Sequence, residues 1–305
     1  MSTPLQWRVA RLVVSTTMPE VAVVADTCHY MPPELVERLG IGVVPLHVLL
    51  PDGTEKLEND YPDFSEFYEV LMSCTDELPK TSQPSPGEFL AVWEPLLDEG
   101  REIVCLTISG GVSGTAASAL QAREMLESRA ERVFIVDSKS GAGGEGLIVL
   151  AAAAAARAGR SGAAVAEHAE AARDKTRIWF AVDTLEYFER GGRIGRAQAW
   201  IGSALKIKPI LTIEEEISPI ERVRTSAKAF QRMVQYLELL ASDGQNGWCV
   251  QHIRNPDQAA ALAAEGRKIF GNEPLFVSEV GPVMGTYAGP GMLGVGGMPL
   301  SFTQI

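Results

Sequence analysis

The sequence predicts an α/β fold in which a mostly parallel β-sheet carries helices on both faces. Short, wholly apolar runs such as Val21–Asp26 (VAVVAD) have the composition of strands that are covered on both sides. Such runs alternate along the chain with longer segments whose apolar residues recur at helical spacing, which is the order of βαβ units. At 305 residues the chain is long enough for two compact domains.

The elements expected in the first half follow this alternation. Strands are predicted at 21–26, 41–50, 102–108 and 132–137, and helices at 32–39, 65–74, 87–97, 115–128 and 144–158. Ser85 stands before Pro86 and Gly87 and is a good N-cap for the third of these helices. The longest apolar run, Gly146–Ala156, is well short of the roughly 20 residues that span a membrane, so it predicts a buried helix.

The second half repeats the alternation with longer helices. Strands are predicted at 177–182, 207–213, 248–253 and 274–280, and helices at 163–175, 225–242 and 257–270. A turn signal at Gly159–Ser161 predicts the boundary between a first domain at 21–160 and a second at 161–305. Residues 1–20 are expected to be an extension, and Arg8 and Arg11 interrupt its apolar stretch, which argues against a signal peptide.

Composition excludes several classes of function. The net charge of −12, from 27 basic and 39 acidic residues, argues against nucleic acid and anionic membrane surfaces as partners. The four cysteines lie far apart and no CxxC pair exists, so neither a metal site nor a cofactor is expected. The same cysteine usage is typical of a reduced, cytoplasmic protein.

Loops that follow parallel strands bind ligands in α/β proteins, and several such loops here carry small hydroxyl side chains. Thr81 and Ser82 precede Ser85 and are not needed to cap its helix, so they are candidates to touch a ligand. Asp26 and Thr27 end the first strand, where Asp26 either forms an Asx turn or orients a hydroxyl. Ser138 ends another strand before a glycine turn.

The loop within Ile108–Ala119 (ISGGVSGTAASA) runs from a strand into a helix. Its glycines, Gly110 and Gly114 among them, let the backbone approach a ligand, and the helix N-terminus offers N–H groups to an anion. The loop is no nucleotide-binding motif, so a small anionic group suits it best; a plain turn capped by Ser113 is the alternative. Arg190, Arg193 and Arg196 cluster in a later loop and either bind an anion or an acidic partner, or lie in solvent.

Two enzymatic alternatives also follow from these residues. Ser113 as the nucleophile of an acyl hydrolase needs a histidine base in reach, but none of the four histidines lies in a comparable loop, and the surrounding VSGT is not GxSxG. A small-molecule kinase subunit similar to dihydroxyacetone kinases would need a glycine-flanked histidine to capture a ketone. The sequence offers no such histidine.

Six segments taken together resemble the DegV family. They are KTSQPS, the VSGT loop, VDS with its glycines, DTLEYFERGGRI, KIKPIL and GPVMGTYAGPG, and they occur in the family's order from about Val21 to Gly296. The resemblance implies a three-layer N-terminal domain, a two-layer C-terminal α/β domain and a long-chain fatty acid held between them. It also implies that a separate ATP-binding kinase subunit phosphorylates the bound carboxylate, so this chain is a carrier and not itself an enzyme.

The resemblance also assigns the site residues. Thr81 and Ser113 match the hydroxyls that hold the carboxylate, with Ser82 and Gly114 beside them, and Arg190 and Arg193 match a segment that serves partner docking or head-group charge. Tyr287 stands where the family usually has a histidine; a tyrosine donates a hydrogen bond but does not titrate near neutrality. Gly110 replaces a second serine. Three apolar residues are candidates to line the tail's path: Phe180, Leu185 and Phe188.

Overall fold

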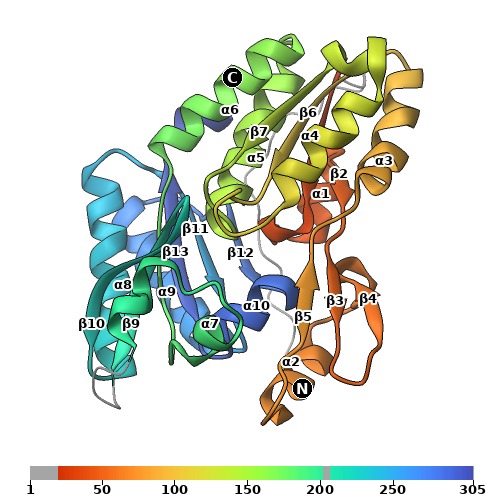
Figure 1. Cartoon of the computed structure of the whole chain (residues 1–305). Coiled ribbons are helices and arrows are strands. Elements are labelled where there is room, and N and C mark those ends of the chain that lie inside the picture. Colours follow the sequence, from red (N-terminus) through yellow and green to blue (C-terminus); the bar gives the residue numbers. More distant parts are fainter. Residues whose placement is uncertain (1–19, 202–206, 305) are drawn as a thin grey trace, which may run out of the picture.

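The computed structural model describes residues 20–201 and 207–304. The predicted extension at residues 1–20 therefore lies outside the described residues, apart from residue 20. Two β-sheets form the frame of the molecule, and the chain passes from the first to the second at Thr176 (Figure 1). Among the described residues, none of the helices is both long and apolar enough to cross a lipid bilayer.

The first sheet is parallel and has the order β2–β1–β6–β7. Its strands are β1 (Val21–Asp26), β2 (Gly42–Val44), β6 (Glu102–Thr107) and β7 (Val133–Asp137). Helices α3 (Pro86–Asp98) and α4 (Thr115–Met125) cover one face, while the other face is covered by α1 (Pro33–Leu39), α5 (Gly143–Arg157) and α6 (Gly162–Lys175). The predicted three layers are confirmed, and the double cover explains why the strands are apolar between their ends.

The predicted strand at 41–50 is wrong, because the segment forms two strands in different sheets. β2 ends before Pro45, which has no N–H to offer a sheet, and Leu46 N instead donates to Thr27 Oγ1 at 3.3 Å. Beyond the break, β3 (His47–Leu49) joins a small antiparallel sheet with β4 (Glu55–Leu57) and β5 (Lys80–Ser82), and α2 (Ser65–Ser73) follows β4. Thr81, which was expected in a loop, therefore stands in β5.

The second sheet has six strands in the order β10–β9–β8–β13–β11–β12. All neighbouring pairs are antiparallel except β11–β12. The strands are β8 (Arg177–Ala181), β9 (Lys208–Glu214), β10 (Glu216–Val223), β11 (Gly247–His252), β12 (Phe276–Glu279) and β13 (Leu293–Met298). β10, β13 and the helix α10 (Pro282–Ala288) were not predicted from the sequence; the three glycines of β13 weaken its strand signal.

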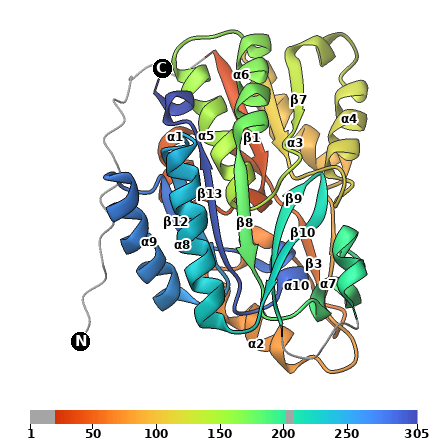
Figure 2. The same ribbon diagram turned by 90° about the vertical axis from the view of Figure 1, so that its left-hand side faces the viewer.

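The two faces of the second sheet have different neighbours. Helices α8 (Ser226–Ser242) and α9 (Pro256–Phe270) lie side by side over the outer face, as Figure 2 shows, where Trp248 is fully buried. The inner face turns toward the first domain and presents alternate residues of its three central strands: Ile178, Phe180, Cys249, Gln251, Gly294 and Gly296. The predicted two-layer second domain is thus confirmed, with its free face against the first domain.

The division of the chain at residues 160 and 161 stays a prediction. α6, which follows that position, packs on α5 and against β6 and β7 of the first sheet. The short helix α7 (Glu186–Arg190) follows β8 and contacts α10.

Candidate functional site

A mainly apolar cavity lies between the two domains. It holds about 970 Å³ of atom-free space, part of which is open to solvent. Ile108 and Ala142 of the first domain face Ile178, Phe180 and Met292 of the second across it. Neither domain alone encloses this space.

Polar side chains gather at one end of the cavity, which we call the mouth. Thr81 Oγ1 and Tyr287 OH are 2.6 Å apart, although they come from β5 and α10, at opposite ends of the chain. The Arg193 guanidinium lies over the Tyr287 ring, 5.4 Å from its centroid, in a cation–π contact. Ser113 Oγ lines the same space and pairs with Thr115 Oγ1 at 2.8 Å. The mouth thus offers the hydroxyl groups of Thr81, Ser113 and Tyr287 and the cation of Arg193 to an anionic ligand.

The helix that carries Tyr287 is attached to the first domain by a buried carboxyl group. Glu58 Oε1 accepts hydrogen bonds from Val283 N at 2.7 Å and from Tyr30 OH at 2.8 Å, and Thr27 Oγ1 donates to the other oxygen. Burial raises the pKa of Glu58 to about 7, against the effect of these hydrogen bonds. Thr27 therefore lies behind the mouth and not in the cavity lining.

A second buried carboxyl group supports the loop that carries Ser113. Asp26 accepts hydrogen bonds from Cys28 N at 2.8 Å, which confirms the Asx turn, and from Ile108 N at 2.7 Å. Burial raises the pKa of Asp26 to about 6. Glu145, fully buried in the first turn of α5, has its pKa raised well above the usual value by burial and then by the charge of Asp26. Through its hydrogen bond with Ile108 N, Asp26 thus fixes the start of the loop that carries Ser113.

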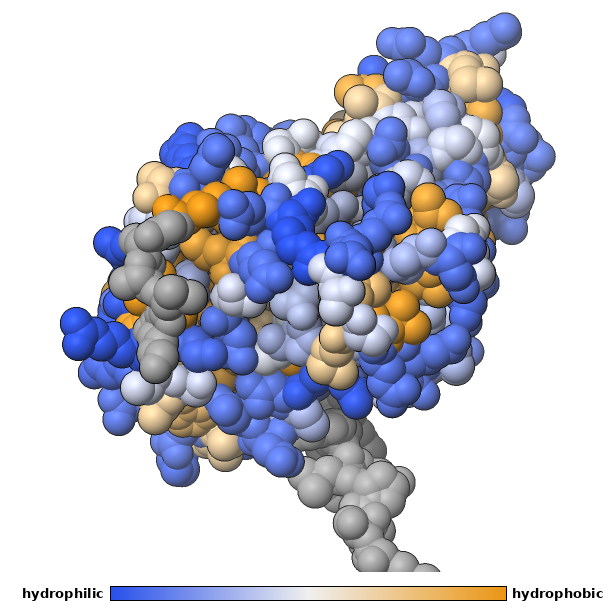
Figure 3. Space-filling view, turned by 60° about the horizontal axis from the view of Figure 1, so that its bottom comes forward, coloured by the Kyte–Doolittle hydropathy of each residue, from blue (hydrophilic) through white to orange (hydrophobic). Residues whose placement is uncertain are grey.

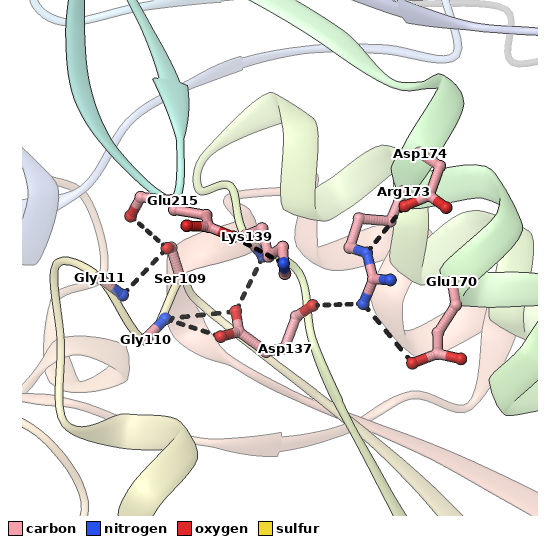
Figure 4. Close-up of polar contacts among 9 residues, drawn as sticks. All are labelled: Ser109, Gly110, Gly111, Asp137, Lys139, Glu170, Arg173, Asp174 and Glu215. Carbon is pink, nitrogen blue, oxygen red and sulfur yellow. Dashed lines mark hydrogen bonds and ion pairs between the residues drawn. The ribbon is translucent and has the colours of Figure 1, made fainter.

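The tip of the β9–β10 hairpin docks on the same loop, as Figure 4 shows. Ser109 Oγ donates to the Glu215 carbonyl at 2.5 Å, Glu215 N donates to the Lys139 carbonyl at 3.0 Å, and Lys139 Nζ pairs with Glu215 Oε1 at 2.6 Å. A Cβ atom on Gly111 would lie 2.1 Å from the Glu215 carbonyl oxygen, so only glycine fits there. We call Ser109, Gly111, Lys139 and Glu215 the clasp.

Two further predicted residues belong to the surroundings of the clasp. Gly110 N donates to both carboxylate oxygens of Asp137, at 3.1 and 3.2 Å (Figure 4). Ser138 is buried, and its Oγ donates to the Ser140 carbonyl at 3.1 Å. Both residues make these bonds within the first domain, and neither lines the cavity.

The other predicted residues divide between the cavity and its exterior. Ser82 lines the mouth and is exposed, whereas Gly114 lies outside the lining, against the Gln83 side chain. Arg190 also lies outside it; its guanidinium donates to the Thr75 carbonyl at 3.1 Å and pairs with Glu186. Of the residues expected along the tail, Phe180 and Phe188 line the cavity and Leu185 is buried beyond it.

The residues that line the cavity can bind a ligand but include no side chain that could act as a general base for Ser113. Among the described residues that form it there is no histidine and no carboxylate, so Ser113 has no general base within the cavity. The same absence leaves the ketone-capturing alternative without its histidine. Residues 20–201 and 207–304 hold no group of three His, Cys, Asp or Glu side chains suited to a metal ion.

Comparisons with known proteins agree on one family. A family model described as an uncharacterised protein of the DegV family matches residues 20–299. A DegV domain-containing protein of Streptomyces coelicolor is 39% identical over 285 residues, which cover 90% of this chain and 97% of the relative.

Solved structures from this family have the same fold. A DegV family protein from Thermus thermophilus, described by its fatty acid binding, superposes with a TM-score of 0.80 at 33% identity, over 92% of this chain and 99% of that one. DegV from Bacillus subtilis, described as a fatty acid binding protein, gives a TM-score of 0.81 at 33% identity, over 92% and 100% of the two chains.

Proposed function

The chain belongs to the DegV family, and on that premise we propose that it binds a long-chain fatty acid in the cavity between its domains. The observation that carries this proposal is the distribution of polarity in the cavity. Thr81, Ser113 and Tyr287 gather at the mouth with Arg193, where they suit a carboxylate. Apolar side chains make up most of the remaining wall, where they suit an acyl chain.

Energetics assign different tasks to the two parts of such a ligand. Each buried methylene group contributes about 0.8 kcal/mol, so a tail of about 14 methylenes contributes roughly 11 kcal/mol at most. Two charge-assisted hydrogen bonds at about 1.5–3 kcal/mol each contribute less, and carboxylate desolvation offsets much of that. The tail therefore sets the affinity, while the hydroxyl groups of Thr81 and Ser113 set the orientation.

We further propose that the bound carboxylate is presented to a separate ATP-binding kinase subunit in the cytoplasm. Ser82, Gln83 and Arg193 are exposed at the mouth, so a partner can reach an acid bound there. In that reaction a carboxylate oxygen attacks the γ-phosphorus of ATP, giving an acyl phosphate and ADP, with catalysis supplied by the partner. Arg190 and Arg193 are the candidate docking cations, and Tyr287 supplies a hydrogen bond where relatives have a titrating histidine.

The surface supports an interior position for the tail. Figure 3 shows apolar groups in separate patches among hydrophilic ones. The most exposed large apolar side chains of the described residues are also spread over several elements: Leu49, Met72, Leu120, Met125, Ile220 and Leu239. Scattered residues of this kind are ordinary for a folded surface and form no alternative groove for an acyl chain.

Native mass spectrometry of the purified protein tests the proposal. We expect a stoichiometric adduct, and denaturing mass spectrometry of an organic extract should identify it as a long-chain acid. A protein that carries no adduct and takes up no added long-chain acid would refute fatty acid binding. Mixing the loaded protein with ATP and a kinase subunit then tests presentation separately, through the appearance of acyl phosphate.

A further inference from the structure

The helix α10 belongs to the second sheet by sequence and to the first domain by most of its contacts. It connects β12 to β13, yet it packs against α2, β3 and β5 of the first domain as well as against α7 (Figure 1). Tyr287 stands in its last turn, where the tyrosine hydroxyl meets Thr81 of β5. The place of this hydroxyl at the mouth therefore depends on what fixes α10 to the first domain.

The start of α10 is held by two side chains that lie outside the cavity lining. Val283 N, in the first turn, donates to Glu58 Oε1 at 2.7 Å, and Met284 N donates to Tyr30 OH at 3.1 Å. Tyr30 OH in turn donates to the same Glu58 oxygen at 2.8 Å. One carboxyl oxygen thus caps two N–H groups of the helix, the first directly and the second through a hydroxyl, although neither Glu58 nor Tyr30 lines the cavity.

The packing at both ends of α10 is tight. A Cβ atom on Gly281 would lie 2.7 Å from Tyr30 Cε1 and 3.0 Å from Glu58 Oε1, so a glycine is needed for this close approach. A Cβ atom on Gly191 would lie 2.4 Å from Tyr287 Cδ1, so the tyrosine ring lies directly on the backbone at the end of α7. Since α10 has only seven residues, a displacement of its start also moves Tyr287 near its end.

We propose that Glu58 is a positioning residue for the bound carboxylate: it fixes α10 and so places the Tyr287 hydroxyl beside Thr81 and the ligand. Glu58 acts through the hydrogen bonds that Oε1 accepts, which an uncharged amide oxygen also accepts. Thr27 Oγ1 donates to the other oxygen and, because a hydroxyl can also accept, it suits an amide nitrogen equally well. This inference rests on the proposed function, because it concerns the site of the acid's head group.

The test measures the affinity for stearic acid by calorimetric titration of delipidated variants. Glu58→Met removes the acceptor but keeps the length of the side chain, and it should weaken binding about fivefold, as should Tyr287→Phe. The variant with both changes should lose about fivefold and not about 25-fold, because Glu58 acts through Tyr287. Glu58→Gln keeps the acceptor, so it should bind within about twofold of the wild-type protein.

A matched control comes from another carboxylate that binds the start of a helix outside the cavity lining. Glu102 Oε2 accepts from Gly162 N, at the first residue of α6, at 2.7 Å. Glu102→Met should therefore lower stability, as Glu58→Met does, but leave the affinity for stearic acid unchanged. If Glu102→Met weakens binding as much as Glu58→Met, the loss reflects general destabilisation and the inference is wrong.

The remaining outcomes separate this inference from the function on which it rests. An unchanged affinity in Glu58→Met, a loss of about 25-fold in the double variant, or a Glu58→Gln variant as weak as Glu58→Met would each overturn the inference. If the wild-type protein binds no acid, the proposed function itself fails and the inference with it. Should Glu58→Met not fold, Tyr30→Phe replaces it in the same cycle, because it removes the acceptor of Met284 N; its loss of affinity must then vanish in the Tyr287→Phe background.

Discussion

The mouth and the deep end of the cavity are built in different ways. The mouth takes Thr81, Ser113, Arg193 and Tyr287 from four separate segments, and its residues are partly or fully exposed. The deep end, by which we mean the part of the lining on the inner face of the second sheet, consists of alternate residues on neighbouring strands, and two of them are glycines against which neighbouring side chains pack. The comparison teaches that recognition of a charged group and accommodation of a chain reside in separable parts of one cavity.

The two ends also differ in what supports them. Behind the mouth lie the ionisable groups Asp26 and Glu58, which hold the Ser113 loop and α10 in place. Behind the deep end lie apolar layers of α8 and α9, with Trp248 fully buried. We therefore expect pH to act on the mouth and side-chain volume to act on the deep end, and the following experiments separate the two.

Filling the deep end has the largest expected effect. A Cβ atom on Gly296 would already lie 3.0 Å from Ile178 Cγ2 and 3.2 Å from Cys249 Sγ, so the side chain of Gly296→Leu must extend into the cavity. Displacing about four methylene groups of the ligand costs about 3 kcal/mol, or roughly 100-fold in the affinity for stearic acid. Titrations with stearic and lauric acid measure it; equal losses for both acids would show that the variant disturbs more than the deep end.

The pH dependence of stability tests the support of the mouth. Burial raises the folded-state pKa of Asp26 to about 6 and of Glu58 to about 7, so the folded protein binds more protons than the unfolded chain. The titration of these two groups should therefore lower the free energy of unfolding by about 5 kcal/mol as the pH rises from about 4 to about 7. The buried histidines His29 and His252, whose pKa burial lowers to about 4, oppose this fall by a similar amount, so the wild-type profile should be nearly flat and that of Glu58→Gln should rise with pH. Urea denaturation across this range measures the slope.

Glu145→Gln provides the control for this slope. Burial and the charge of Asp26 raise the pKa of Glu145, so the folded protein holds this proton at pH values where the unfolded chain has released it. The free energy of unfolding therefore decreases as the pH rises. The neutral amide should therefore make the protein more stable above neutrality and leave its stability near pH 4 almost unchanged. A Glu145→Gln variant that is no more stable than the wild-type protein above neutrality would contradict the raised pKa of Glu145.

Removal of the mouth hydroxyls should have a smaller effect on affinity. Thr81→Val combined with Ser113→Ala should weaken stearic acid binding by about tenfold, because water at the exposed mouth replaces part of the lost hydrogen bonding. Ser85→Ala is a matched control: this nearby hydroxyl caps α3 from outside the cavity, so its loss should lower stability by about 1 kcal/mol and leave affinity intact. Unchanged affinity in the double variant would remove Thr81 and Ser113 from the site.

The clasp should show the smallest change. The side chains of Lys139 and Glu215 are 48% and 64% exposed, so Lys139→Met should cost less than about 0.5 kcal/mol in unfolding free energy. Ser109→Ala removes a hydrogen bond to the Glu215 carbonyl and should cost about 1 kcal/mol. Denaturation in low and high salt distinguishes them, because only the ion pair is screened. The reverse ranking would mean that charge, and not the backbone contact, holds the hairpin.

The same comparison explains what the sequence reveals. Ser113 could be singled out because a hydroxyl in a loop that follows a strand is a local signal, as is the cap at Ser85. Thr81 was singled out as a loop hydroxyl as well, although it stands in the strand β5. Pro45 was also a local signal, but the apolar residues around it favoured one long strand over two.

The deep end and the buried carboxyls depend on contacts that no local pattern encodes. Glu58 meets Val283, 225 residues away, and Gln251 meets Tyr30, 221 residues away. Their burial follows only from the packing of the two domains. The strand β13 was missed because its three glycines weaken a strand pattern.

The clasp has a kinetic consequence. Ile213 and Ile217 of the β9–β10 hairpin form part of the cavity wall, and the tip of that hairpin is held by the loop that bears Ser113. A displacement of the hairpin that widens the passage for an acyl chain therefore also disturbs the hydroxyl that orients its carboxylate. The rate of ligand exchange and the positioning of the carboxylate are therefore coupled. Variants selected for rapid loading of the acyl chain should hold the carboxylate less accurately.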